Sequence, residues 1–304
     1  MHIYLPIAEL SINVFVLFGL GFGVGLLSGM FGVGGGFLLT PLLIFIGVPP
    51  PVAVGTAANQ IVASSVSGMV AQLRRGNVDI KMGLVLMAGG FVGSWIGIWL
   101  FGLLKGLGQI DLVIQLSYVV FLGSVGGLMG AEAARTILRR KRGRATPRLH
   151  EHTWLHGLPF KVRFRRSRLY ISALLPIGLG LLVGIVASVL GAGGGFFALP
   201  AMIYLIGMPS SIVVGTSLFQ ITFVAANVTL LQAVTHHSVD AVLALILLVG
   251  GVIGAQIGSR WAMRLPGEHL RSLLALLILG VALKLAFDLV ATPDDLFTVT
   301  MAQP

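Results

Sequence analysis

Long stretches without any charged side chain constrain this chain more than any other feature of its sequence. Residues 10–73 and 169–235 contain no Asp, Glu, Lys or Arg, and neither do residues 82–104. About 20 apolar residues in a helix cross the hydrocarbon core of a bilayer, so the two longer stretches must each hold several apolar helices. The composition, with 56% hydrophobic and 10% charged residues, is also unlike that of a soluble domain. The sequence therefore predicts an all-α polytopic membrane protein.

The positive charge of the chain is concentrated in one loop. More than half of its 20 Lys and Arg residues fall between residues 139 and 168, which separate two apolar halves. The positive-inside rule predicts that this basic loop is a cytoplasmic linker. We accordingly expect a multi-pass protein of the cytoplasmic (inner) membrane, surrounded by the lipid bilayer. Nucleic acid is not an expected partner, and RNA binding by the loop is the less favoured alternative. The N-terminus lacks the basic segment of a cleaved signal peptide.

The two apolar halves share one order of short motifs. Residues 32–41 read G-V-G-G-G-F-L-L-T-P, and residues 191–200 read G-A-G-G-G-F-F-A-L-P. The later shared motifs are Gly-x-Pro at 47 and 207, Val-Gly-Thr at 54 and 214, Val-Asp at 78 and 239, and spaced glycines at 89–97 and 250–258. A common order over about 70 residues indicates an internal repeat. We predict membrane repeat 1 at 10–138, the basic linker at 139–168 and membrane repeat 2 at 169–290.

Each repeat is predicted to contain about five transmembrane segments, one of which is short. The glycine triplets at 34–36 and 193–195 precede the short apolar segments 37–46 and 196–206. Ten residues of helix span about 15 Å, half of a hydrocarbon core. If all five segments cross, the basic residues between segments fall on the side of the linker: Arg74, Arg75, Lys81, Arg260, Arg264 and Arg271. An odd number of crossings makes the two copies inverted repeats, with both termini outside.

The two glycine breaks are the predicted substrate site. Irregular backbone is tolerated within a membrane only where it is buried in protein or lines a watery cavity. A helix that begins there presents free N–H groups and a positive dipole end to an anion. Paired broken helices near the midplane are a recurrent substrate site of secondary transporters. The candidate substrate-binding residues are Gly34, Gly35, Gly36, Thr56, Asn59, Gln60, Gly193, Gly194, Gly195, Thr216, Gln220 and Asn227.

A plainer interpretation is available for part of this pattern. Polar side chains within the membrane also form hydrogen bonds between helices, and glycines also let helices approach closely. For the glycine series at 19–29, 89–97 and 250–258 we favour close packing. For the two triplets we favour the substrate site.

Other motifs do not indicate an enzyme. The glycines are followed neither by the Gly-Lys-Ser/Thr of a phosphate-binding loop nor by the acidic residue of a dinucleotide-binding motif. The sequence shows no Ser-His-Asp set and no His-Glu-x-x-His, and it has no cysteine for disulfides or thiolate metal sites. We expect no catalytic residues, no metal and no cofactor. The pair His236–His237 is expected in a solvated turn, with proton coupling as the alternative.

The repeated motifs resemble those of the sulfite exporter TauE/SafE family of membrane permeases. The resemblance rests on G-x-G-G-G-F-[LF]-x-x-P, G-x-P and V-G-T-[AS]-x-x-Q, which occur in both halves. It covers nearly the whole chain apart from the linker. It implies a multi-pass prokaryotic transporter whose substrates are sulfur-containing anions such as sulfite or sulfoacetate. The family's motifs fall on Gly34–Gly36, Gly193–Gly195, Gly55–Thr56, Gln60, Gly215–Thr216 and Gln220, while Phe219 stands where the first repeat has Asn59.

We therefore expect a secondary transporter that exports sulfite or a small organosulfonate by alternating access. An anion channel, an uptake permease of the same family and a structural membrane protein are the alternatives. Because the charge-free segments hold no carboxylate to carry a proton, coupling would use the proton of hydrogen sulfite or the membrane potential. The oligomeric state is open, with a homodimer as one option.

Overall fold

The computed structural model describes residues 2–31, 34–141, 161–164, 166–167, 169–261 and 267–290. Most of the basic linker, Gly32, Val33 and Arg264 lie outside the described residues. The elements in chain order are β1 (His2–Leu5), β2 (Leu10–Asn13), α1 (Val14–Phe31), α2 (Gly36–Phe45), α3 (Pro50–Arg74), α4 (Ile80–Gly106), α5 (Ile110–Lys141), β3 (Lys161–Phe164), β4 (Leu169–Ser172), α6 (Leu174–Leu190), α7 (Gly195–Tyr204), α8 (Ser210–Leu231), the π-helical turn η2 (Gln232–His236), α9 (Ala241–Trp261) and α10 (Gly267–Val290).

The two halves have the same order of elements. A β-hairpin precedes a long apolar helix, a ten-residue helix follows, and three longer helices complete each half. In the described part of the chain, five helices are long and apolar enough to cross a membrane. The predicted all-α polytopic membrane protein is thus confirmed. The two antiparallel hairpins were not predicted from the sequence, and β3–β4 spans the predicted boundary at residues 168–169.

Each half packs mainly on helices of the other half. Helix α1 lies along α9, α4 lies along α6, and α3 lies beside α8. A Cβ atom on Gly25 would overlap the carbonyl of Gly251, and one on Gly21 or Gly29 would also overlap the α9 backbone. The series at 89–97 meets the α6 backbone in the same way. These glycines therefore serve close helix packing, as the sequence indicated.

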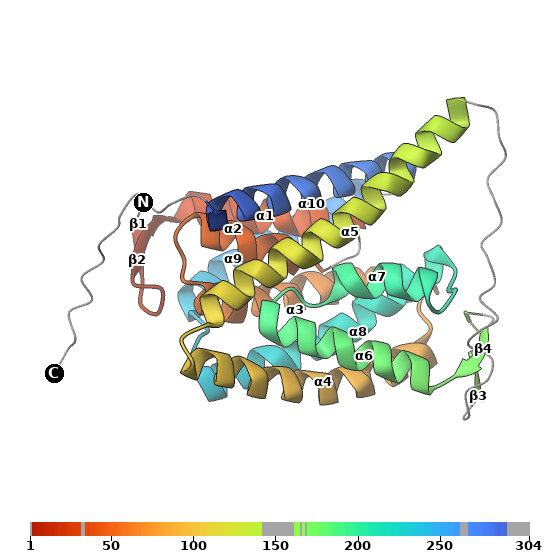
Figure 1. The fold of residues 1–304 in the computed structure, drawn as a ribbon, viewed down its shortest axis with the longest axis horizontal. Coiled ribbons are helices and arrows are strands. Elements are labelled where there is room, and N and C mark those ends of the chain that lie inside the picture. The colour runs from red at the N-terminus through yellow and green to blue at the C-terminus, as the bar shows by residue number, and fades with distance from the viewer. Residues whose placement is uncertain are drawn as a thin grey trace.

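The first long helices of the two halves, α1 and α6, begin at opposite ends of the molecule (Figure 1). The hairpins β1–β2 and β3–β4 lie at opposite ends of the helical layers (Figure 1), and each leads directly into α1 or α6. Contacts between α1 and α9 advance along both helices together, from Gly21 with Leu247 to Gly29 with Ala255. These two helices are therefore parallel, and the contacts of α4 with α6 show the same progression.

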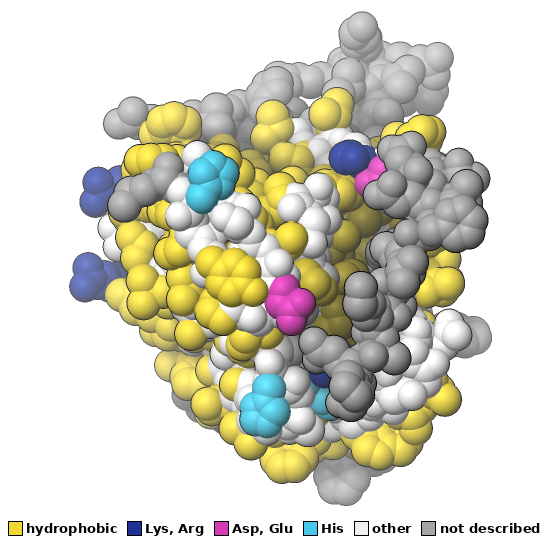
Figure 2. Space-filling model, turned by 90° about the vertical axis from the view of Figure 1, so that its left-hand side faces the viewer, with side chains coloured by type: hydrophobic (Ala, Val, Ile, Leu, Met, Phe, Trp, Pro, Cys, Tyr) yellow, Lys and Arg dark blue, Asp and Glu magenta, His cyan; other side chains and the backbone are white. Residues whose placement is uncertain are grey.

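Basic side chains gather at the β3–β4 end. The Arg166 guanidinium donates a 2.7 Å hydrogen bond to the carbonyl of Gly76, in the turn between α3 and α4. Arg74 and Arg75 belong to the same turn, and Arg260 lies near the end of α9 that faces it. The opposite end of the molecule, viewed in Figure 2, shows mostly hydrophobic and uncharged described side chains. Arg74, Arg75 and Arg260 thus share one end, as the charge pattern predicted, while Arg264 lies outside the described residues.

Candidate functional site

Both glycine breaks have the backbone conformation that glycine alone adopts readily. Gly34 and Gly35 have φ values of 86° and 76°, and Gly193 and Gly194 have 65° and 67°. This left-handed region is costly for residues with a Cβ atom. Helix α2 then begins at Gly36 and α7 begins at Gly195, each ten residues long. The predicted break followed by a half-length helix is present in both repeats.

The structure brings the two breaks together around two isoleucines. A Cβ atom on Gly34 would lie 3.3 Å from Ile61 and 3.4 Å from Ile221, and one on Gly193 would lie 2.9 Å and 3.4 Å from the same side chains. Both isoleucines are fully buried. The first aromatic residues after the breaks, Phe37 and Phe196, also meet, with ring centroids 5.8 Å apart.

Gln60 and Gln220 are buried with unused hydrogen-bonding capacity. Each is 0% exposed, and the oxygen and nitrogen of both side-chain amides have no hydrogen-bond partner within the described part of the chain. The Gln60 amide lies against Gly251, while that of Gln220 lies 3.7 Å from where a Cβ of Gly90 would be. Leaving a buried amide unpaired costs about 1–3 kcal/mol per group. Such a cost in both repeats is expected where a ligand supplies the missing partner.

Thr56 and Thr216 hold the starts of helices in the opposite half. The Thr56 hydroxyl accepts a hydrogen bond from the backbone N–H of Asp240, at 3.2 Å, and Thr216 accepts from that of Asp79, at 3.0 Å. Both threonines are fully buried. Their positions therefore have a structural explanation, and contact with substrate stays a prediction.

Asp79 and Asp240, which belong to the repeated Val-Asp motif, are buried carboxylates that were not predicted as functional residues. The Asp79 carboxylate accepts from the Met82 N–H at the start of α4 and from the backbone and hydroxyl of Ser167, at 2.7 Å for the hydroxyl. The Asp240 carboxylate caps α9 and also accepts from the Ile7 N–H at 3.0 Å. Ser167 and Ile7 lie in the turns of the two hairpins. Each hairpin therefore locks the helix start at its own end of the molecule.

The remaining candidates are Asn59 and Asn227. Asn59 is half-buried on α3. The Asn227 amide donates a 2.6 Å hydrogen bond to the Ser94 hydroxyl on α4, which ties α8 to α4. Asn227 thus bridges two helices in the manner of ordinary polar residues in membranes.

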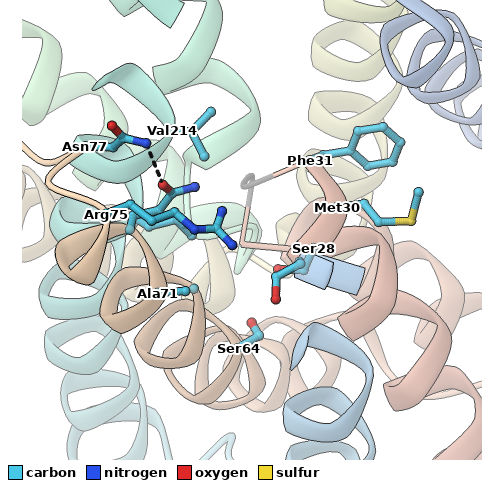
Figure 3. Close-up of a pocket in the computed structure, with 13 residues that line it drawn as sticks. Ser28, Met30, Phe31, Ser64, Ala71, Arg75, Asn77 and Val214 are labelled. Atoms are coloured by element: carbon cyan, nitrogen blue, oxygen red, sulfur yellow. Dashed lines mark hydrogen bonds between the residues drawn. The ribbon is translucent and has the colours of Figure 1, made fainter. Parts of the chain in front are cut away.

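A cavity of about 250 Å³ extends from the basic end toward the first break (Figure 3). The Ser64 hydroxyl on its wall donates to the carbonyl of Gly34 at 3.2 Å, and a Cβ on Gly35 would lie 2.9 Å from Ser28, another lining residue. The described lining residues are Ser28, Gly29, Met30, Phe31, Ser64, Gly68, Ala71, Gln72, Arg75, Asn77, Val214, Leu218 and Ser259. The twelve candidates from the sequence are absent from these described lining residues.

The equivalent region of the second half is filled. Val224 and Val228 stand where the first half has Ser64 and Gly68, and both pack in a buried apolar cluster. Toward the far end, Gln232 donates to the carbonyl of Ser188 at 3.1 Å and accepts from the hydroxyl of Ser238 at 3.0 Å. We call Gln232, Ser188 and Ser238 the far-end cluster.

The far-end cluster adjoins the π-helical turn η2. Gln60 matches Gln220 in the repeat, whereas Val78 matches Val239, one residue further on. The extra residue falls where η2 widens the helix, as single insertions in helices often do. Beyond it, the His236 ring packs against Phe101 in a tilted arrangement, with centroids 5.0 Å apart. The second half is thereby closed at the end opposite the cavity.

The sequence is similar to those of several proteins named as membrane transporters. A family model described as "Sulfite exporter TauE/SafE" matches residues 17–285. A "Probable membrane transporter protein" of Xylella fastidiosa (strain 9a5c) is 28% identical over 89% of this chain and 94% of the relative. The "Probable membrane transporter protein YjnA" of Bacillus subtilis (strain 168) is 29% identical over 91% of this chain and 100% of the relative. "Sulfite exporter TauE/SafE family protein 3" of Arabidopsis thaliana is 30% identical over 35% of this chain and 24% of its own length. No solved structure matches.

Proposed function

The chain belongs to the sulfite exporter TauE/SafE family of membrane transporters, and from this premise we propose that it exports sulfite or a small organosulfonate. It acts as a secondary transporter in the cytoplasmic membrane of a prokaryote. The two halves work as inverted repeats by alternating access, with the basic end in the cytoplasm. The bilayer and a small sulfur-containing anion are its partners, and the reaction is transport rather than catalysis.

The observation that carries this proposal is a pair of buried, unpartnered amides, each one residue before an isoleucine that contacts both breaks. Gln60 and Gln220 are buried with all their amide atoms free in the described structure. The N-terminal ends of α2 and α7 add the positive ends of two helix dipoles at the breaks. No Lys or Arg occurs in the charge-free stretches that hold these groups. An anion held by dipoles alone is bound weakly enough to be released, as a transporter requires.

The opposite directions of α1 and α6 support the inverted arrangement. Each half has its own hairpin, broken helix and capped helix start, and the two sets begin at opposite ends (Figure 1). Inverted repeats of this kind expose one central site alternately to the two sides of a membrane. A cavity at one end and a closed far-end cluster at the other correspond to one of the two states of alternating access, with the site open to one side of the membrane.

Flux into proteoliposomes tests the proposal. Radiolabelled sulfite, sulfoacetate and sulfate are supplied to vesicles that contain the wild-type protein or the Gln60→Ala/Gln220→Ala double variant. The control variant is Ser124→Ala, because the Ser124 hydroxyl donates only to a carbonyl one turn earlier in α5. We expect saturable flux of sulfite or sulfoacetate, lost more than about tenfold in the double variant and retained in the control. Thermal unfolding in detergent checks that each variant folds.

Counterflow separates a carrier from a channel. Unlabelled substrate inside the vesicles should accelerate entry of the labelled anion in a carrier, whereas a channel gives no such acceleration. Comparing flux in the two directions across oriented vesicles distinguishes export from uptake. Absence of flux for all three anions, under imposed pH and voltage gradients, would refute the substrate assignment.

A further inference from the structure

We infer that the cavity between α1, α3 and α8 is an anion-selective entry site in which Arg75 recognises the oxyanion group of the substrate. The substrate class, small sulfur oxyanions, rests on the proposed function. Selection of anions over cations by the cavity is independent of the proposed function, because it depends only on the sign of the charge that the cavity admits.

The position of Arg75 gives it access to both the cavity and the solvent. It directly follows the last residue of α3, and its side chain is exposed at the basic end of the molecule. Figure 3 shows the guanidinium reaching into the cavity, on the side facing Ser28. A guanidinium donates paired N–H groups in a planar fork, which fits two oxygens of a sulfite or sulfonate group.

Among the residues that the structure describes, the exposed charges around the cavity mouth have one sign. No acidic residue is among the described residues that line the cavity. Arg74, Arg166 and Arg260 lie at the same end, while the nearby buried acid, Asp79, is engaged by Met82 and Ser167. A recess with low-dielectric walls and one sign of charge concentrates ions of the opposite sign.

The walls suit a small anion that carries a short carbon chain. Met30, Phe31 and Leu218 supply apolar surface, and Gln72, Asn77 and Ser28 supply polar groups. The Asn77 amide donates to the Gln72 oxygen at 3.3 Å, so the Gln72 NH₂ group is not used in that bond (Figure 3). A volume of about 250 Å³ holds one such anion with some of its water.

The cavity extends from the charged guanidinium of Arg75 toward the first glycine break, where helix and amide dipoles replace full charges. Ser64 connects its wall to the first break through the carbonyl of Gly34. In the second half the position equivalent to Arg75 falls within η2 and holds Thr235 or His236, depending on where the extra residue is placed, so no arginine stands there. An anion that arrives from the basic end is therefore selected by charge at Arg75 and passed to the dipole site, whereas the far end has no matching arginine at this position. Arg75 is thus a specificity-determining residue of the transport path.

A single introduced thiol measures the potential inside the cavity. The chain has no cysteine, so Ala71→Cys creates the one reactive thiol, on the cavity wall one helical turn before Arg75. Its rates of reaction with an anionic and a cationic methanethiosulfonate of similar size are compared. In this background, Arg75→Gln should lower the anion-to-cation rate ratio by about tenfold, because one unit charge near the thiol is removed. Arg75→Lys should retain most of the ratio, and the matched control Arg74→Gln should change it less than about twofold.

Equilibrium binding of radiolabelled sulfite to the purified proteins tests recognition itself. Arg75→Gln should weaken binding about tenfold or more relative to wild type and to Arg74→Gln. An unchanged thiol ratio, or an equal fall in the Arg74 control, would overturn the entry site. A lowered ratio with unchanged sulfite affinity would overturn recognition by Arg75. A lowered ratio in a protein that neither binds nor transports a sulfur anion would support the entry site and instead refute the proposed substrate.

Discussion

Replacing Gln232 by Leu should open the end of the molecule that the far-end cluster closes. The substitution keeps a side chain of similar size but removes two buried hydrogen bonds, to Ser188 at 3.1 Å and from Ser238 at 3.0 Å. Each such bond contributes about 1 kcal/mol net, so the closed arrangement loses about 2 kcal/mol. Because 1.4 kcal/mol corresponds to a factor of ten, the equilibrium should shift by about 30-fold toward opening at this end.

Labelling of a buried thiol reports this opening. Val228→Cys places the only thiol in the filled region of the second half, where the native side chain is 0% exposed. A membrane-impermeant maleimide should label it about 10–30 times faster in the Gln232→Leu background. Gln72→Leu, at the equivalent position beside the cavity, is the matched control and should leave the rate unchanged. Equal labelling in all three backgrounds would show that the far-end cluster does not hold this end closed.

Two predictions concern the joints between the halves, and both are measured as apparent melting temperatures in detergent. Gly25→Ala should cost about 1–3 kcal/mol of stability, because its Cβ would overlap the α9 backbone, whereas Gly23→Ala has nothing within 4 Å and should be neutral or slightly stabilising. Equal effects would contradict the packing argument. Asp79→Ala should cost about 3 kcal/mol, because three groups lose a buried carboxylate, while Thr216→Val removes one hydrogen bond and should cost about 1 kcal/mol. The reverse order would show that Asp79 does not secure the hairpin.

The broken helices could be predicted from sequence because their signals are local. A glycine triplet, a ten-residue apolar segment and a Gly-x-Pro turn fix the starts of α2 and α7 at Gly36 and Gly195, as found. The grouping of basic residues at one end was predictable too, since it follows from the number of helices between them. The repeat predicted that the two breaks form one site, but it did not predict that Ile61 and Ile221 lie between them.

Features that depend on contacts between the halves could not be predicted from either half. The hairpin β3–β4 lies in a segment whose high charge predicted a loop, and four-residue strands give little alternation to detect. Arg75 was interpreted as a marker of topology because its neighbours in space, on α1 and α9, are distant in sequence. Likewise, the bond from the Tyr118 hydroxyl to the Leu190 carbonyl, 2.7 Å long, joins α5 to the end of α6.

The two halves stabilise each other through contacts between residues far apart in sequence, and this affects how the protein folds during synthesis. The N–H of Ile7 finds its acceptor 233 residues later, at Asp240, and α1 presents its glycine face to α9. Since synthesis proceeds from the N-terminus, α1 enters the bilayer while its neighbour is still untranslated. Until α9 has been synthesised, α1 lies in the bilayer, or in contact with the insertion machinery, without its main packing partner. Correct folding of the first half therefore depends on the last third of the chain, because that part contains α9, which packs against α1.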